Sequence, residues 1–91
     1  MSVLHTLSAL PGTEACTDCM RMLAEGDALL LMGDGVYAAD LAAAKPDVDV
    51  FILASDAAAR GVSSTPANSE HISMKQVVQL TVRFERQVAW Y

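Results

Sequence analysis

The fold is decided by one stretch, Gly26-Asp27-Ala28-Leu29-Leu30-Leu31-Met32-Gly33-Asp34-Gly35-Val36-Tyr37-Ala38-Ala39. Its centre, Ala28 to Met32, is an unbroken apolar run that is too short for an ordinary helix. A run of this kind suits a strand that is buried on both faces, as in a parallel sheet. The chain then turns at Gly33-Asp34-Gly35 into an alanine-rich segment that ends at Pro46, a pattern that predicts a helix. A strand, a tight turn and a helix make half of a βαβ unit, so we expect a small α/β domain with a parallel sheet.

The rest of the chain supplies the other strands and helices of such a domain. Apolar, β-branched segments predict strands, and capping residues or glycines predict where helices begin and end. On this basis we expect a strand at Val3 to Leu7, a helix from Thr13 to about Glu25 stopped by Gly26, a strand at Val48 to Ala54, a short helix at Ala57 to Arg60 capped by Ser55-Asp56, and a brief strand at His71 to Ser73. The polar residues 61–70 are expected to form a loop that either binds a ligand or is mobile.

The segment from Met74 to Arg86 fits two patterns. Apolar and polar residues alternate from Val78 to Glu85, which is strand periodicity. However, Ser73-x-x-Gln76 is a capping box, which marks the start of a helix. We expect a helix, because a parallel strand before it needs a crossover, and we expect the apolar residues 87–91 to dock rather than fray. The whole pattern predicts a four- to five-stranded, mainly parallel sheet with helices on both faces.

Length and composition limit the class of protein. Ninety-one residues allow one domain, residues 1–91, and 53% of them are hydrophobic, which is above the usual share. A parallel sheet this small leaves open edges and faces, so the surplus of apolar residues argues for burial against partner subunits. The net charge of −5 disfavours direct binding to nucleic acid, which needs clustered cations.

The sequence carries no signal for a membrane or for export. No segment reaches the roughly 18 apolar residues that span a bilayer. The amino terminus, Met1-Ser2-Val3-Leu4-His5, lacks the charged and apolar regions of a signal peptide. We therefore expect a cytoplasmic protein, in which two cysteines are free thiols or a redox site rather than a structural disulfide.

Cys16 and Cys19 carry the most informative chemistry in the chain. With Met20 and Leu23 they recur at i, i+3, i+4 and i+7 on the first predicted helix, so they belong to one apolar stripe that faces the sheet. Spacing alone therefore favours small core side chains. A sulfur carrier instead needs a reachable thiolate, and a thioredoxin-type dithiol would use both cysteines. Such a dithiol usually opens its helix directly after a strand, whereas several loop residues precede Cys16.

Other polar residues are assigned structural roles. Gly33-Asp34-Gly35 lacks the third glycine of a dinucleotide-binding turn, and its acid would repel phosphate, so we expect Asp34 to cap the following helix. His5 is expected to be a hydrogen-bonded residue within its strand. His71, which follows the polar loop, is a more open candidate for the edge of a site. Neither histidine has a zinc-ligand spacing to the cysteines, so we expect no metal and no cofactor.

Four ordered blocks of the sequence resemble the DsrH/TusB family. They are Leu4-His5-Thr6-Leu7; Glu25-Gly26-Asp27-Ala28-Leu29-Leu30-Leu31 with Asp34-Gly35-Val36-Tyr37-Ala38-Ala39; Ala59-Arg60-Gly61-Val62; and Val78-x-Leu80-Thr81-Val82 followed by Gln87-Val88-Ala89-Trp90. The resemblance covers nearly the whole chain, and the four blocks in order are more specific than any one of them.

The resemblance implies a DsrE-type, three-layer α/β domain and a place in a heterohexamer that passes sulfur along as cysteine persulfide. It implies two paralogous partners, a DsrE/TusD-like and a DsrF/TusC-like subunit, and a downstream DsrC/TusE-like sulfur acceptor. In the TusBCD branch the sulfur goes toward 2-thiouridine at tRNA wobble positions, and in the DsrEFH branch the complex serves dissimilatory sulfur oxidation. In both branches the principal persulfide cysteine belongs to the TusD or DsrE subunit.

The same resemblance singles out Cys19 as the persulfide candidate of this chain. Cys19 stands seven residues before Gly26, as the DsrH-branch cysteine does before the glycine of its Glu-Gly pair. Cys16 has no such counterpart. Three functions stay open at this point: a non-catalytic or accessory subunit of a sulfurtransferase complex, an independent CxxC thiol-disulfide oxidoreductase, and an interaction subunit with inert thiols.

Overall fold

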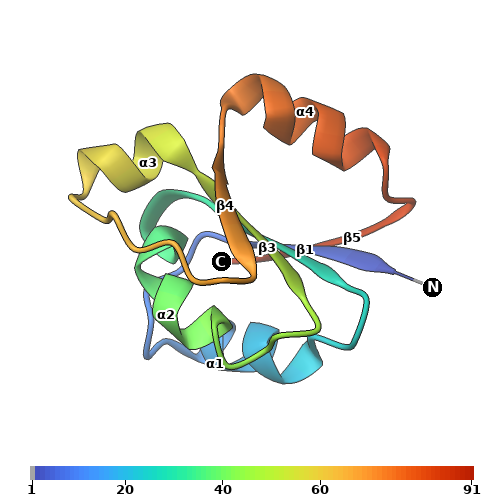
Figure 1. Ribbon diagram of the computed structural model, residues 1–91. Helices are drawn as coiled ribbons and strands as arrows, with labels where there is room; N and C mark the ends of the chain where they lie inside the picture. Colours follow the sequence, from blue (N-terminus) through green and yellow to red (C-terminus); the bar gives the residue numbers. More distant parts are fainter. Residues whose placement is uncertain (1) are drawn as a thin grey trace.

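Five parallel strands form one sheet in the computed structural model, which describes residues 2–91 (Figure 1). The strands lie in the order β4-β3-β2-β1-β5. They are β1 (Val3–Leu7), β2 (Ala28–Leu31), β3 (Asp49–Leu53), β4 (Ser69–Ile72) and β5 (Arg86–Trp90). The apolar run that decides the fold is therefore the central strand β2, and all four of its residues are buried.

Helices follow the first four strands and cover the sheet from both sides. They are α1 (Glu14–Met22), the 3-10 helix η1 (Gly33–Ala38), α2 (Ala39–Ala42), α3 (Ala54–Ala59) and α4 (Met74–Val82). Figure 1 shows α4 on one side of the sheet and α1 with α2 on the other. The predicted fold class, an α/β parallel sheet with helices on both faces, is confirmed. No helix within residues 2–91 is long and apolar enough to cross a bilayer.

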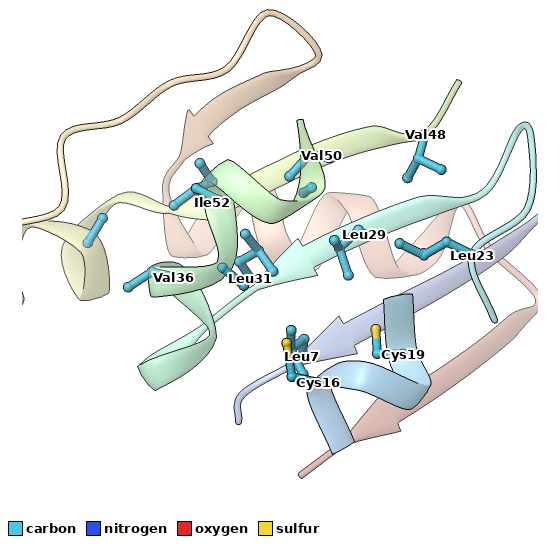
Figure 2. Packing of buried hydrophobic residues seen from close by; sticks show 14 residues of the cluster. Leu7, Cys16, Cys19, Leu23, Leu29, Leu31, Val36, Val48, Val50 and Ile52 are labelled. Atoms are coloured by element: carbon cyan, nitrogen blue, oxygen red, sulfur yellow. The ribbon is translucent and has the colours of Figure 1, made fainter. Parts of the chain in front are cut away.

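Alternate side chains of the strands build two separate cores. On one face Leu7, Leu29 and Ile52 pack with apolar residues of α1, η1 and α2, and the cluster includes both cysteines (Figure 2). On the other face Leu4 and Leu30 pack with apolar residues of α4. Because β2 contributes to both clusters, burial on its two faces explains why its apolar pattern does not alternate.

The first helix ends earlier than predicted, at Met22 instead of about Glu25. The reason is the turn that leads into β2. In this turn the backbone N–H of Ala24 donates to the carboxylate of Asp27, and the N–H of Asp27 donates to the carbonyl oxygen of Ala24. A side chain that binds nearby backbone groups competes with continuation of the helix. Gly26 supplies the left-handed residue of the turn, with a φ of +88°.

The capping roles predicted for Asp34 and for Ser55-Asp56 are wrong. η1 begins without a side-chain cap, and α3 begins one residue before Ser55, so that Ser55 and Asp56 lie inside it. Asp56 instead reaches the carboxyl end of β2, where its Oδ2 accepts the backbone N–H of Gly33 over 2.7 Å. This cap comes from another element of the fold, and a local sequence pattern cannot register it.

Two further boundaries differ from the prediction, one is confirmed, and one strand was not predicted. The helix expected to run to Pro46 is η1 followed by α2, which ends at Ala42, and β4 begins at Ser69 rather than His71. The capping box at the start of α4 is confirmed. The last residues, predicted only to dock, form β5 beside β1. Because β5 is largely exposed at the edge of the sheet, its sequence lacks a buried strand's apolar pattern, and pairing with β1 defines it.

Candidate functional site

The two cysteines lie one turn apart on α1 and face the sheet. Thr13 is the N-cap of this helix, as predicted, and its Oγ1 accepts the backbone N–H of Cys16 over 3.2 Å. Cys16 is 2% exposed and Cys19 is fully buried. Figure 2 shows both sulfur atoms among the buried side chains between α1 and the sheet. The fold thus brings the two thiols together in the core rather than at the surface.

Burial suppresses the reactivity of Cys19. Burial, with a smaller contribution from the nearby Cys16, raises the pKa of the Cys19 thiol from 9.0 to about 12. A pKa that high leaves a thiolate fraction on the order of one in 100,000 at neutral pH. Because the thiolate is the form that attacks sulfur, Cys19 in this conformation is protected from sulfur donors and oxidants.

A groove of about 350 Å³ between α1 and α2 reaches the other thiol. Cys16 lines it together with the apolar side chains of Met20 and Leu41 and with the cations Arg21 and Lys45. The second cysteine of α1 does not line this groove. Of the two thiols, Cys16 is therefore the one nearer to an open surface.

The Gly33-Asp34-Gly35 turn is a structural element rather than an anion site. The N–H of Gly33 donates to Asp56, and the N–H of Gly35 donates to the carbonyl oxygen three residues before it over 2.8 Å. Asp34 accepts a hydrogen bond from Nε of Arg60 over 3.0 Å. With these N–H groups already bonded and a carboxylate in the turn, the segment offers no cradle for phosphate.

The loop before β4 is held in place by side chains at its end. Nε2 of His71 lies 3.1 Å from the carbonyl oxygen of Ser64. Nδ2 of Asn68, which carries two N–H donors, lies within hydrogen-bond distance of three carbonyl oxygens, those of Ala42, Lys45 and Val48. A role for His71 at the edge of a site stays a prediction. Within residues 2–91 no three His, Cys, Asp or Glu side chains come together as ligands for a metal.

A buried polar chain of three residues was not predicted from the sequence. His5 lies in β1 and is hydrogen-bonded, as expected. Its Nε2 lies 3.1 Å from Oδ2 of Asp27, and its Nδ1 lies 3.1 Å from Nε1 of Trp90. Two signals point to these partners in retrospect. One is an acid placed directly before a buried strand, and the other is a tryptophan in a terminal segment that must dock.

Comparison with known proteins identifies the family. The sequence model described as "DsrH like protein" matches residues 11–87. The chain belongs to the DsrH family. Similar relatives, each called Protein TusB, come from Pectobacterium parmentieri (38% identity), Klebsiella pneumoniae strain 342 (34%) and Escherichia coli O81 strain ED1a (35%). Each alignment covers 97% of this chain and 100% of the relative, so the resemblance seen in the four sequence blocks is confirmed.

Two solved structures share the fold of this DsrH-family chain. The crystal structure of the ychN protein from E. coli matches with a TM-score of 0.76 and 16% identity, over 98% of this chain and 97% of that one. The solution structure of protein Tm0979 from Thermotoga maritima matches with a TM-score of 0.69 and 20% identity, over 91% and 94%. At these identities the likeness concerns the fold alone.

Proposed function

We propose that this DsrH-family chain is a subunit of a sulfur-relay complex that serves 2-thiolation of wobble uridine in tRNA. The observation that carries the proposal is the alignment with Protein TusB over nearly the full length of both chains. The proposal includes a heterohexamer with DsrE/TusD-like and DsrF/TusC-like subunits in the cytoplasm, and a DsrC/TusE-like acceptor of the sulfur. Dissimilatory sulfur oxidation is the alternative pathway.

Exposed apolar side chains support an assembly role. Met74, Val78 and Val82 lie at i, i+4 and i+8 on α4, and they are 54%, 58% and 82% exposed. They form an exposed line along α4. Val77 and Leu80 lie on another face of the same helix, which is buried against the sheet. Contiguous exposed apolar side chains mark interaction sites on soluble proteins. Part of the apolar surplus of the sequence therefore lies where a partner subunit can cover it.

For Cys19 the proposal is conditional on movement of α1. A persulfide donor R–S–SH passes its outer sulfur to the Cys19 thiolate: an S–S bond forms on Cys19, the donor's S–S bond breaks, and the donor leaves as a thiolate without net oxidation. Cys19 is fully buried and its pKa is raised, so this attack requires α1 to lift from the sheet. While the helix stays packed, Cys19 is shielded from attack, and a dithiol needs both cysteines, which favours an accessory subunit over an independent CxxC oxidoreductase.

The pathway is tested by deleting the gene in its native host and measuring 2-thiouridine in digested tRNA by mass spectrometry. We expect the modified nucleoside to be lost and to return when the gene is supplied on a plasmid. Unchanged 2-thiouridine, with loss of growth on reduced sulfur compounds, would contradict the tRNA pathway and support the oxidation branch.

The role of Cys19 is tested on the assembled complex with a persulfide donor. The expected product carries an adduct of about 32 Da, the mass of one sulfur atom, on Cys19. Cys19→Ser should remove the adduct and the matched variant Cys16→Ser should keep it. An adduct found only on a partner subunit would overturn the role of Cys19 and leave an accessory subunit of the same complex.

A further inference from the structure

Three residues from distant parts of the chain form a buried relay of hydrogen bonds. Nε1 of Trp90, on β5, lies 3.1 Å from Nδ1 of His5, on β1. Nε2 of His5 lies 3.1 Å from Oδ2 of Asp27, which precedes β2. His5 and Asp27 are each 4% exposed. The relay therefore runs from β5 through β1 to the start of β2, and its two titratable members are buried while Trp90 is partly exposed.

The partners of the relay allow only one assignment of its hydrogens. Asp27 accepts the backbone N–H groups of Val3 and Ala24, each over 3.0 Å, so its carboxylate acts as an acceptor. Burial opposes the charge on Asp27, yet these hydrogen bonds and the one from His5 hold its pKa below the usual value. Nε2 of His5 must therefore donate to Asp27. An indole N–H can only donate, so Nδ1 of His5 must be the acceptor, and the imidazole is the neutral Nε2–H tautomer.

We propose that a proton taken up by His5 releases Trp90 and loosens the carboxyl end of β5. A proton on Nδ1 turns the acceptor of the indole N–H into a second donor, so that two N–H groups face each other over the same short distance. The bond from Trp90 is then lost, while the bond to Asp27 becomes an ion pair and persists. The device makes the anchoring of the C-terminal strand depend on the charge of one buried histidine.

β5 is the strand on which such a loss has the greatest effect. It lies at an edge of the sheet and pairs only with β1. Its carboxyl end is held by Trp90, whose carbonyl oxygen accepts the N–H of Ser8 over 3.1 Å and whose ring stacks on His5 with centroids 6.3 Å apart. Trp90 also packs against the apolar cluster that contains Leu7. Edge strands open at lower free-energy cost than central ones, so loss of the hydrogen bond to His5 should make this end open more often.

No other charged group around His5 removes the repulsion between the N–H groups of Trp90 and protonated His5. Asp27 is the carboxylate in contact with it. On the elements packed against His5, α1 carries the thiols of Cys16 and Cys19 and the solvent-accessible Glu14, Asp18 and Arg21, and β5 begins at the exposed Arg86. The pKa of Cys19 is raised, so this thiol is protonated and neutral at neutral and acid pH. Among the described residues, none of these groups accepts a hydrogen bond from Nδ1 of His5, whose one hydrogen-bond partner there is the indole N–H of Trp90.

The proposal is tested by NMR on the assembled protein with its histidine nitrogens labelled. At neutral pH we expect the ring of His5 to carry its proton on Nε2. As the pH is lowered until His5 takes up a second proton, the protection factor of the Ser8 amide should fall roughly tenfold, the worth of one hydrogen bond, while that of the central Leu30 amide stays constant. Trp90 is the only tryptophan, so its fluorescence should change with the same midpoint.

Two variants distinguish the loss of this one hydrogen bond from a general destabilisation of the protein at low pH. Trp90→Phe keeps an aromatic ring but removes the indole N–H, so the protection of the Ser8 amide should no longer respond to the charge of His5. His71→Gln removes the other histidine and should leave the response intact. Two results would overturn the proposal: a proton on Nδ1 of His5 at neutral pH, or a protection factor of the Ser8 amide that does not change when His5 is protonated. Both are measured on the unmodified protein, so the test holds even if Trp90→Phe does not fold.

Discussion

The carbonyl oxygen of Leu7 lies 2.0 Å from the position that a Cβ atom on Gly35 would occupy. The end of β1 and the start of η1 therefore touch through their backbones, and only glycine fits. We expect Gly35→Ala to lower the free energy of unfolding by about 3 kcal/mol, since the backbone of one segment must shift. Urea unfolding of the purified variant measures the loss.

Gly61→Ala is the matched control for this substitution. Gly61 has a φ of +68° and nothing within 4 Å of its missing Cβ, so the variant carries only the cost of a left-handed alanine, about 1 kcal/mol. Equal losses for the two variants would show that the close approach of Gly35 to Leu7 adds no penalty of its own.

The sequence was sufficient to predict the fold, because its strongest signals are periodic and local. The apolar run of β2, the N-cap Thr13 and the capping box at Ser73 each act within a few residues, and each is confirmed. The predictions failed where a side chain from elsewhere in the chain caps or ends an element. Asp56 caps Gly33 from another helix, and Asp27 ends α1 early. Such contacts exist only after the chain has folded.

The position and the burial of the two cysteines were predictable from the sequence, and their reactivity was not. The helical spacing placed Cys19 on the stripe that faces the sheet, and the structure puts it there with no exposed surface. Whether a core thiol becomes reactive depends on how readily α1 leaves the sheet, which spacing does not encode. The relay of His5, Asp27 and Trp90 joins residues up to 85 positions apart, so local patterns mark its members one by one but cannot pair them.

The cap supplied by Asp56 gives a second prediction. Asp56→Ala removes a charge-assisted hydrogen bond of 2.7 Å to the N–H of Gly33 and should cost about 1–2 kcal/mol. Asp34→Ala breaks only a partly exposed pair with Arg60 and should cost less than about 0.5 kcal/mol. Thermal or urea unfolding compares the two. The reverse ranking would mean that Asp34 is the cap after all.

Asp27 makes stability depend on pH at the acid end. Its pKa in the folded protein lies below the usual 3.8, so its contribution is complete above that value and is lost as the pH falls through the lower, folded value. We expect Asp27→Asn to destabilise the protein at neutral pH and to flatten this acid loss. Asp47→Asn, at an exposed position, should reproduce the wild-type pH curve of urea midpoints. An unchanged acid profile in Asp27→Asn would contradict the assignment.

Cys19 makes stability depend on pH at the alkaline end. Its pKa is raised from 9.0 to about 12 on folding, so the stabilisation is complete below pH 9.0 and declines as the pH rises toward the folded value. Cys19→Ala should weaken this alkaline decline, at the cost of a small cavity. Cys16→Ala makes a similar cavity and should keep the decline. The measurement is the free energy of unfolding between pH 8 and 10.5, and a decline that is equally steep in Cys19→Ala and in the wild type would refute the burial of its thiol.

The exposed line on α4 gives a prediction about assembly. Val78→Asp places a charge on this line, whereas Gln79→Asp places the same charge on a neighbouring exposed position. Both variants should fold as the wild type does, since neither side chain is buried. Val78→Asp should weaken binding to the paralogous subunits at least roughly tenfold, as burial of an unpaired charge requires, and Gln79→Asp should not. Equal binding of the two would move the interface away from this line.

Native mass spectrometry of the chain co-expressed with the two paralogous subunits proposed as its partners tests the central claim most directly. Membership of a sulfur-relay complex predicts one assembly that contains all three chains, with this chain present at the same copy number as its partners. A chain that stays monomeric while the two partners assemble without it would contradict the account.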